Sequence, residues 1–405
     1  MTTTITSAHT VGVTGQPVTI ECELVRRLPS VVIVGLPAAA CRETAERVRS
    51  AITASGCDFP RKRVVVNVSP NVRRGASGLD LAIAVAILTA SGDFPGNRLR
   101  TAFIGELSLS GDLRPVRGII AAVTALRDAG IERVVVPAEQ GPDAALVEGI
   151  IVLGAASLHD VVKGTVVGVD PARSRDARHT PDFSDVVGHE EAIAALEDAA
   201  VTGQSVLLIG PPGSGKTLLA CRLPSILPPL TPEEALEVTS IRDAAGLQEP
   251  GAGLVTRRPF RAPHHTVSVA GLIGTASLRP GEVTLAHRGV LFLDELPEFG
   301  RPAIEAVRRV VQDKWISVAR ADGTTTLPAD LQLLAAASPC PCGWAGTTRC
   351  TCGPELGERY RARIPFDLFG AVIQLRPLSS EEVLAGDPNE SSAAIRERVV
   401  AARAR

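Results

Sequence analysis

The pattern of apolar and polar positions divides the chain into two α/β regions. In the first, short alternating runs predict strands and longer segments with helical periodicity predict helices. The expected elements are β-like runs over Gly12–Val34, a helix over Glu43–Ile52, a strand over Arg63–Pro70, a buried helix over Leu79–Ala90 and a hairpin over Phe103–Leu113. Helices and strands then alternate from Ile119 to Leu153. We therefore expect one α/β domain at residues 1–162.

The second region starts after a segment that has no periodicity. Residues 163–182 are rich in Gly, Pro, Asp and Arg and are expected to form a linker. A helical segment at Glu190–Ala200 follows, and the apolar runs Val206–Ile209 and Val290–Leu293 are typical of strands buried on both faces of a parallel sheet. We expect an α/β core with such a sheet at residues 183–378 and a further helical segment at 379–405.

A glycine-rich loop follows the first of these apolar runs, and a helix is expected from Leu218. Its glycines let backbone N–H groups face phosphates, Lys216 can reach the β- and γ-phosphates, and the Thr217 hydroxyl can ligate Mg²⁺. A glycine-rich turn without a ligand is the plain alternative, but the full pattern with its flanks favours binding of ATP and Mg²⁺. The residues assigned to this site are Gly210, Pro211, Pro212, Gly213, Ser214, Gly215, Lys216 and Thr217.

Two acidic residues follow the second apolar run. The strand expected at Val290–Leu293 ends in Asp294 and Glu295, which places two carboxylates at the carboxyl edge of a parallel sheet. Asp294 is expected to hold Mg²⁺, directly or through water, and Glu295 to polarise the attacking water. A solvated helix start is the usual meaning of such a pair, but its position downstream of a complete phosphate-binding loop favours catalysis, with Lys216 as the third catalytic residue.

The cysteines fall into two groups. Four are scattered singly, which suits reduced thiols better than a disulfide framework. The other four form two Cys-x-Cys pairs, Cys340 with Cys342 and Cys350 with Cys352. Such pairs can close a tetrahedral zinc site that fixes a loop; plain thiols in a flexible loop are the alternative.

Composition narrows the function further. The 405 residues include 42 basic and 44 acidic side chains, so the chain has no overall basic field, and a nucleic acid would have to bind to local patches. Aromatic residues are only 3%, which leaves few platforms for base stacking. The N-terminus lacks a signal-peptide pattern and no apolar run is long enough to cross a membrane. We expect a cytoplasmic protein without a membrane partner.

Several segments of the first region resemble the Mg-chelatase-like AAA+ ATPases of the ComM/YifB group. They are Val34-Gly-Leu-Pro, Glu46–Ile52, Val66–Pro70 and Gly105–Gly118. In that group the N-terminal domain is similar to the proteolytic domain of Lon, so the resemblance implies a Lon-like fold for residues 1–162. A Ser–Lys peptidase is disfavoured, because Ile119–Val123 offers no lysine and Ser77 is out of register with the nucleophile.

The resemblance continues through the second region. It implies an AAA+ ATPase core, with Asp182–Gly188 near the adenine pocket, that forms a homo-hexameric ring and moves DNA, with branch migration in recombination during natural transformation as its role. A basic cluster between the two nucleotide motifs is similar to pore loops that contact DNA phosphates without reading bases. It comprises Arg257, Arg258, Arg261, His264, His265, Arg279, His287 and Arg288. A solvated loop, or histidines as core hydrogen-bond partners, are the alternatives; His264 and His265 have no further ligand spaced for zinc.

The chain departs from this group at three places. Ser338 stands where relatives have an asparagine that positions water, and Ile364–Leu375 has no arginine at the position of a finger for the neighbouring subunit. Residues 379–405 match only the start of a C-terminal helical lid. The alternatives to a DNA motor are therefore an ATP-binding scaffold with weak turnover and, from family likeness, a magnesium-chelatase motor subunit.

Overall fold

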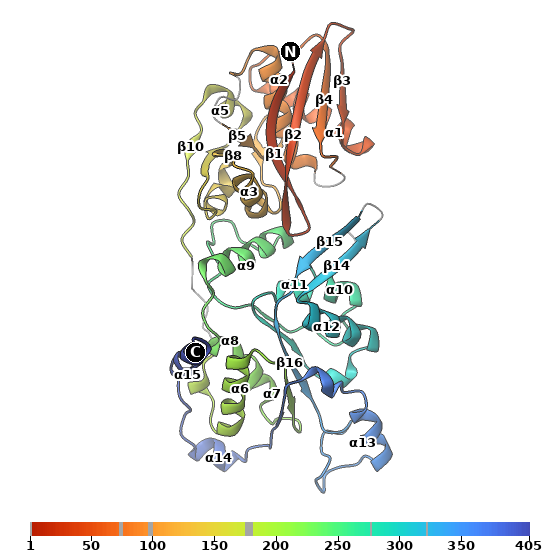
Figure 1. Cartoon of the computed structure of the whole chain (residues 1–405), viewed down its shortest axis with the longest axis vertical. Coiled ribbons are helices and arrows are strands. Elements are labelled where there is room, and N and C mark those ends of the chain that lie inside the picture. Colours follow the sequence, from red (N-terminus) through yellow and green to blue (C-terminus); the bar gives the residue numbers. More distant parts are fainter. Residues whose placement is uncertain (1, 73–75, 96–99, 175–180, 276–277, 321–322) are drawn as a thin grey trace. The chain divides into compact units, whose positions relative to one another are not determined.

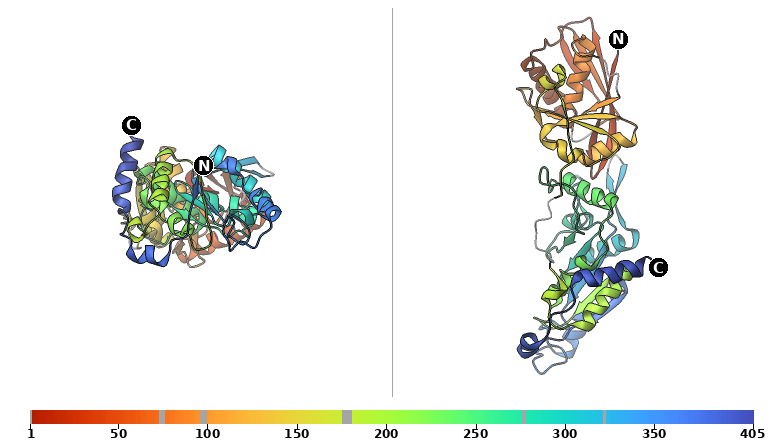
Figure 2. Two further views of the ribbon diagram at one scale, coloured as in Figure 1. Left: turned by 90° about the horizontal axis from the view of Figure 1, so that it is seen from below. Right: turned by 90° about the vertical axis from the view of Figure 1, so that its left-hand side faces the viewer.

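The computed structural model describes residues 2–72, 76–95, 100–174, 181–275, 278–320 and 323–405 (Figures 1 and 2). The chain forms two compact units. One comprises Met1–Arg175 with Thr239–Val255, and the other comprises Asp176–Val238 with Thr256–Arg405.

The first unit is built on a mixed eight-stranded sheet in the order β10-β9-β8-β5-β1-β2-β4-β3. Its strands are β1 (Thr3–Val11), β2 (Thr14–Val25), β3 (Ser30–Val34), β4 (Arg63–Ser69), β5 (Thr101–Phe103), β8 (Arg133–Pro137), β9 (Ile151–Ala155) and β10 (Val167–Gly168). The pairs β1–β2, β2–β4 and β9–β10 are antiparallel and the others are parallel. The expected hairpin is present as β6 (Glu106–Leu107) and β7 (Leu113–Arg114).

Helices pack on this sheet through small and apolar residues. They are α1 (Ala38–Ala54), α2 (Asp80–Ser91), α3 (Ile119–Asp128), α4 (Gly141–Ala144) and α5 (Leu158–Lys163). Every residue of α2 from Leu81 to Leu88 is buried, as their uninterrupted apolar sequence predicts. Helix α3 approaches β2 so closely that a Cβ at Gly15 would lie 2.0 Å from the carbonyl oxygen of Ala121. Only glycine therefore permits this packing.

The linker expected at residues 163–182 is partly structured. Val167 and Gly168 form strand β10, which pairs with Leu153 and Gly154 of β9 and completes the edge of the sheet. A two-residue edge strand carries too little periodicity to be detected in a glycine-containing segment. Residues 175–180 of the expected linker lie outside the described part of the chain.

A segment from the expected core belongs to the first unit instead. Helix α9 (Pro232–Ala245) ends within Thr239–Val255, which groups with the N-terminal residues. The Asp243 carboxylate accepts a hydrogen bond from the backbone N–H of Ile120 at the start of α3 (2.9 Å). The N–H of Gly251 donates to Asp143 (2.9 Å). Sequence periodicity did not reveal this grouping, because it depends on carboxylates that meet backbone amides far away in the chain.

The second unit contains the expected parallel sheet. Its strands, in spatial order, are β12 (Phe260–Arg261), β13 (Val290–Leu293), β16 (Gln332–Ala337), β11 (Val206–Ile209) and β17 (Ala371–Gln374), all parallel. Strands β11, β13 and β16 are buried along their whole length. A separate antiparallel hairpin is formed by β14 (Trp315–Arg320) and β15 (Gly323–Pro328).

The second unit also contains the helices that connect and flank these strands. They are α6 (Glu190–Thr202), α7 (Lys216–Ala220), α8 (Leu223–Ile226), α10 (Val269–Ile273), α11 (Glu282–Leu285), α12 (Arg301–Asp313), α13 (Pro354–Arg361), α14 (Ser380–Ala385) and α15 (Ser392–Arg403). Helix α15 packs on α6 and α8, with Arg398 paired to Glu197 (2.8 Å) (Figure 1). The last helix is therefore part of the core's own packing.

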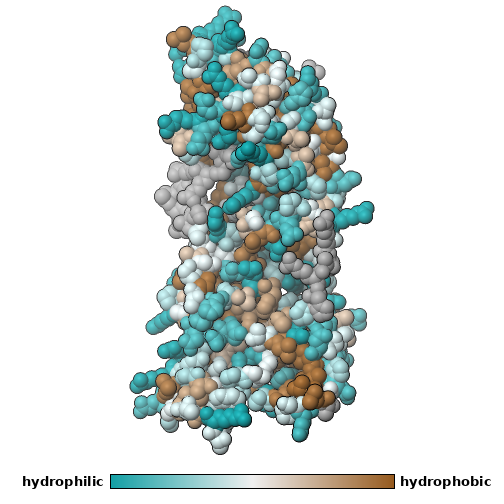
Figure 3. All heavy atoms as spheres, turned by 180° about the vertical axis from the view of Figure 1, so that it is seen from behind, coloured by the Kyte–Doolittle hydropathy of each residue, from teal (hydrophilic) through white to brown (hydrophobic). Residues whose placement is uncertain are grey.

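The surface of the protein is consistent with its nearly equal numbers of basic and acidic side chains. The face shown in Figure 3 is mostly hydrophilic, with apolar side chains in small groups. Among the described residues, no helix combines the length and the apolar character that a membrane span requires.

The buried Asp243 carboxylate predicts a pH dependence of stability. Burial raises the pKa of Asp243 from 3.8 to about 6, so between about pH 4 and pH 6 the folded unit holds a proton that the unfolded chain releases. Its contribution to the free energy of unfolding should fall as the pH rises through this window. Urea denaturation across the window should show that the free energy of unfolding of Asp243→Asn has a more positive slope against pH than that of the wild type, because the variant lacks this falling contribution. Asp170→Asn, at an exposed carboxylate of the same unit, is the control, and equal slopes in all three proteins would contradict the prediction.

Candidate nucleotide-binding site

The expected phosphate-binding loop connects β11 to α7. Gly213 and Gly215 adopt left-handed conformations (φ 77° and 82°), which L-residues with a side chain rarely adopt. The Lys216 ammonium donates to the carbonyl oxygens of Gly210 (2.7 Å) and Pro211 (2.9 Å), so it lies back across the loop. The Ser214 hydroxyl is buried inside the loop and has no hydrogen-bond partner among the described residues. A glycine-rich loop of this kind offers backbone N–H donors of the type that a polyphosphate requires.

The two acidic residues lie beside this loop. Strand β16 pairs in register with both neighbours, Ala337 with Ile209 of β11 and Ala335 with Leu293 of β13. The carboxyl ends of the three strands are therefore adjacent, and the Thr217 hydroxyl donates to Asp294 (3.0 Å). This brings together the hydroxyl and the carboxylate that the sequence assigned to Mg²⁺.

Electrostatics couple the two halves of the site. Burial lowers the pKa of Lys216, and the Asp294 and Glu295 carboxylates act in the opposite direction. Glu295 has a left-handed backbone (φ 53°), and its N–H donates to Asp294 (3.0 Å). The chain therefore turns sharply at the end of β13.

The basic cluster contributes one residue to this site that the sequence had assigned to DNA. The Nδ1 atom of His265 lies 3.5 Å from a carboxylate oxygen of Glu295. The His265 ring also lies against His264, with ring centroids 4.1 Å apart, and edge-on to Phe299. His265 therefore touches a residue expected to act in hydrolysis.

Sequence reasoning did not identify His189 as a site neighbour. It follows the Asp182–Gly188 segment, and a Cβ at Gly215 would lie only 3.0 Å from its Nε2. Burial, and secondarily the charge of Arg376, lowers the pKa of His189. Its left-handed conformation (φ 64°) places the ring over the loop, and no local sequence signal predicts that conformation for a histidine.

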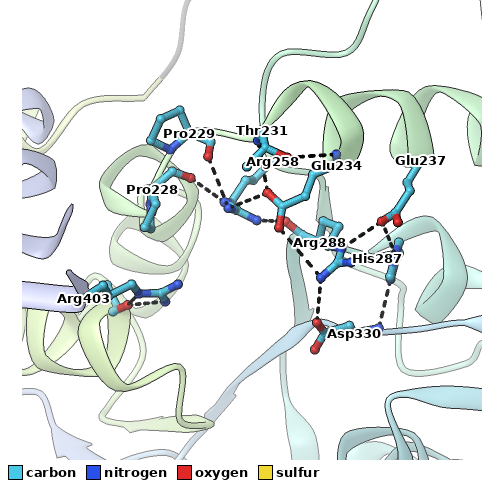
Figure 4. Close-up of polar contacts among 11 residues, drawn as sticks. Pro228, Pro229, Thr231, Glu234, Glu237, Arg258, His287, Arg288, Asp330 and Arg403 are labelled. Atoms are coloured by element: carbon cyan, nitrogen blue, oxygen red, sulfur yellow. Dashed lines mark hydrogen bonds and ion pairs between the residues drawn. The ribbon is translucent and has the colours of Figure 1, made fainter. Parts of the chain in front are cut away.

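Much of the basic cluster is occupied by intramolecular partners (Figure 4). Arg258 donates to the carbonyl oxygens of Pro228 (2.6 Å) and Arg288 (2.7 Å) and pairs with Glu234 (3.2 Å). Arg288 pairs with Glu237 and Asp330, both at 3.0 Å. These contacts hold the start of α9 over the amino ends of β13 and β16, which is the sheet edge opposite the phosphate-binding loop.

Two further members of the cluster are also engaged. Arg261 makes a bidentate pair with Glu282 (2.6 and 2.9 Å). His287 is buried, its Nδ1 accepts from the N–H of Asp330 (3.0 Å), and burial lowers its pKa. Its role matches the alternative of a histidine as a core hydrogen-bond partner. Arg257, His264 and Arg279 remain exposed.

The four clustered cysteines meet next to the phosphate-binding loop. Their sulfur atoms all lie within 4.8 Å of one another, and three of the separations are 3.4, 3.7 and 3.9 Å. Four thiolates around a zinc ion at about 2.3 Å are about 3.8 Å apart, so the donor set fits a tetrahedral metal. Backbone N–H groups, first that of Trp344, lower the pKa of Cys342 to about 5, whereas burial and the neighbouring cysteines raise the pKa of Cys352 to about 11.

The cysteine loop also contacts the phosphate-binding loop directly. It begins with Ser338 at the end of β16, and Cys340 is almost fully buried. A Cβ added at Gly343 would lie 2.5 Å from Cδ of Pro212. The backbone of the cysteine loop therefore packs directly against the phosphate-binding loop.

Comparisons with known proteins agree with this geometry. Residues 182–378 match the family model for magnesium chelatase, subunit ChlI, and residues 20–140 match the model for subunit ChlI of Mg-chelatase. A Lon protease 2 from Bacillus subtilis is 32% identical over 157 residues, which are 33% of this chain and 26% of that protein. This partial similarity is consistent with the expected Lon-like relationship.

Three relatives are similar over most of their length. An uncharacterized protein of Mycobacterium tuberculosis is 42% identical over 404 residues, which cover 97% of this chain and 80% of that protein. YifB of Escherichia coli is 38% identical over 412 residues, with the same coverage. The competence protein ComM of Haemophilus influenzae is 36% identical over 415 residues, which cover 98% of this chain and 81% of ComM. The chain therefore belongs to the Mg-chelatase ChlI-like ATPases of the YifB/ComM family.

Proposed function

We propose that this protein is a cytoplasmic, Mg²⁺-dependent ATPase that works as a homo-hexamer and moves DNA, with branch migration during recombination of incoming DNA in natural transformation as its role. The observation that carries the ATPase proposal is the contact between Thr217 of the phosphate-binding loop and Asp294 at the end of β13 (3.0 Å). The similarity to the competence protein ComM supports the DNA substrate.

In this proposal each residue of the site has a separate role in hydrolysis. Lys216 turns from the carbonyl oxygens of its own loop to the β- and γ-phosphates, and its positive charge stabilises the charge that develops on them. Thr217 and Asp294 would hold Mg²⁺, which would supply charge neutralisation on the phosphates. Glu295 orients and polarises the attacking water.

The DNA contacts of this proposal rest on fewer residues than the sequence indicated. We assign phosphate contacts to Arg257, His264 and Arg279, because these side chains of the basic cluster are exposed, whereas Arg258, Arg261, His287 and Arg288 are partly or fully buried. These contacts would be electrostatic and independent of sequence, so binding should weaken strongly with salt.

A scaffold with weak turnover is the second candidate function. It is favoured by Ser338, whose short side chain follows β16 at the position of the family's water-positioning asparagine, and by the absence of an arginine from Ile364–Leu375. The two candidates differ in what Glu295 does. A motor needs its carboxylate, whereas a scaffold only needs the residues that bind nucleotide.

We further propose that Cys340, Cys342, Cys350 and Cys352 hold a structural zinc ion. Four protein ligands leave no open position for chemistry, so the ion would fix the loop that contacts Pro212. In the N-terminal unit we assign no peptidase. Its expected Lon-like fold carries buried Ile119 and Ile120 at the start of α3 where a catalytic lysine would be required.

Hydrolysis of ATP tests the main proposal. The wild type should hydrolyse ATP with Mg²⁺, faster with single-stranded or forked DNA. Lys216→Ala should lose binding, and Glu295→Gln should lose turnover by about 100-fold or more while still binding ATP. Tight ATP binding by the wild type with turnover no higher than that of Glu295→Gln would establish the scaffold instead. Metal insertion with a porphyrin-loaded partner would support the chelatase subunit.

Metal analysis tests the zinc proposal. The purified chain should contain about one zinc ion per molecule by mass spectrometry, and Cys350→Ser should lower this content. Cys57→Ser, at a thiol outside the cluster, should leave it unchanged. A wild-type protein that stays metal-free after purification with added zinc would show that the cluster consists of plain thiols.

The contact between the two loops gives a prediction with a closely matched control. Gly343→Ala should weaken ATP binding by roughly tenfold, about 1.4 kcal/mol, because the new methyl group would push Pro212 out of place. Gly346→Ala carries the same left-handed strain in the same loop (φ 82° against 83°) but meets no atom within 4 Å. Equal ATP affinities for the two variants, measured by titration calorimetry, would mean that the contact has no effect on the site.

A further inference from the structure

We propose that the second unit carries a further binding site, for a small phosphate ester, in a polar cavity at the amino edge of its parallel sheet. This edge lies opposite the phosphate-binding loop. The inference goes beyond the proposed ATPase function and does not rest on it.

The cavity has a volume of about 330 Å³, which is enough for a small organic anion. Its lining comes from the end of α6, the starts of α9 and β16, and the end of α15, all within the second unit. Four basic and two acidic side chains line it: Arg258, Arg288, Lys314, Arg403, Glu234 and Asp330. Positive charge therefore predominates in the cavity.

The two acidic side chains are each shared between two cations. Asp330 lies 3.0 Å from Arg288 and 3.2 Å from Lys314. Glu234 lies 3.2 Å from Arg258 and 3.8 Å from Arg288. Because one carboxylate cannot neutralise two cations, the lining of the cavity keeps an excess of positive charge.

Arg403, at the end of α15, has no carboxylate as a partner. Its Nε and Nη2 atoms both donate to the carbonyl oxygen of Ala200, and it makes no ion pair within the part of the chain that the structure describes. Arg288, by contrast, has a further carboxylate, Glu237, at 3.0 Å. The positive charge left without a counterpart is therefore that of Arg403.

The charge of Arg403 also acts on a second guanidinium group. In Figure 4 the Arg403 side chain points from α15 toward Arg258. Burial lowers the pKa of Arg258; the Glu234 carboxylate opposes this effect, and the charge of Arg403 adds to it. Since the two guanidinium groups repel each other, an anion placed between them would be attracted by both.

The available donors fit a phosphate group. Among the described residues, neither Nη1 of Arg403 nor Nη2 of Arg288 has a hydrogen-bond partner. Guanidinium N–H groups bind phosphate oxygens in a fixed geometry, and the Lys314 ammonium adds a point charge.

The depth of the cavity favours a small ester over a nucleic acid. The side chains of Arg258 and Arg288 are only 13% and 29% exposed, so a phosphate must enter the cavity to reach them. A terminal phosphate monoester can do so, whereas an internal phosphodiester of a nucleic acid carries sugars on both sides. The ligand is therefore expected to be a small molecule that ends in a phosphate.

Titration calorimetry with ribose 5-phosphate tests this inference. The titrations use the Lys216→Ala protein, so that the phosphate-binding loop does not contribute. This protein should bind one ester per chain, more weakly as salt is added, and should not bind ribose. Arg403→Gln in the same background should weaken binding by about tenfold or more, and Lys314→Gln by a smaller factor.

Arg396→Gln is the matched control. Arg396 lies on the same helix and also donates to a backbone carbonyl oxygen, that of Ser225 (3.2 Å), but it does not line the cavity. This variant should bind ribose 5-phosphate as tightly as its Lys216→Ala parent. Arg258 and Arg288 are left in place because they also hold the start of α9.

Inorganic phosphate identifies the part of the ligand that is recognised. Equal affinities for phosphate and ribose 5-phosphate would show that the phosphate group alone is bound, and a tighter ester would show that the organic group is also held. Absence of saturable binding, or binding that Arg403→Gln leaves unchanged, would overturn the inference. So would Arg403-dependent binding of a single-stranded oligonucleotide without binding of the ester. None of these results depends on turnover, so the ATPase proposal is tested separately.

Discussion

The candidate site depends on one constraint, the in-register parallel pairing of β11, β16 and β13. These short strands are buried on both faces, so their apolar side chains hold the register and any slip would bury polar residues or expose apolar ones. Because parallel strands end at the same edge, the phosphate-binding loop, Ser338 and the Asp294–Glu295 pair emerge side by side. The three strands thus position the residues of the candidate site, although none of those residues lies within a strand.

At the opposite edge of the same sheet, the dense group of basic side chains does not form an open surface for nucleic acid, because most of these side chains are paired within the protein. Arg258 and Arg288 neutralise Glu234, Glu237 and Asp330, and Arg258 also donates to the backbone carbonyl oxygens of Pro228 and Arg288. A guanidinium group with several donors is well suited to this task, because it can bond a carboxylate and a carbonyl oxygen together. Partly buried cations of this kind are held too firmly by the protein to be available for a nucleic acid.

At the carboxyl edge, three segments from different parts of the chain lie against the candidate nucleotide site. The cysteine loop lies against Pro212, His189 lies over Gly215, and His265 touches Glu295. The four-cysteine loop, the segment before the core and a loop with exposed basic residues therefore all lie against the candidate site.

The sequence by itself determined the parallel core, the glycine-rich loop with Lys216 and Thr217, and the acidic pair, because these depend on local composition, spacing and hydrophobic period. It also placed four cysteines close enough to meet. Tertiary structure decided the rest: the two-residue strand β10, the grouping of Thr239–Val255 with the first unit, and the division of the basic cluster into internal pairs and exposed side chains. It also brought His189 and His265 to the site. Those outcomes depend on contacts between residues far apart in the chain and on left-handed backbone conformations, and neither leaves a periodic signal in the sequence.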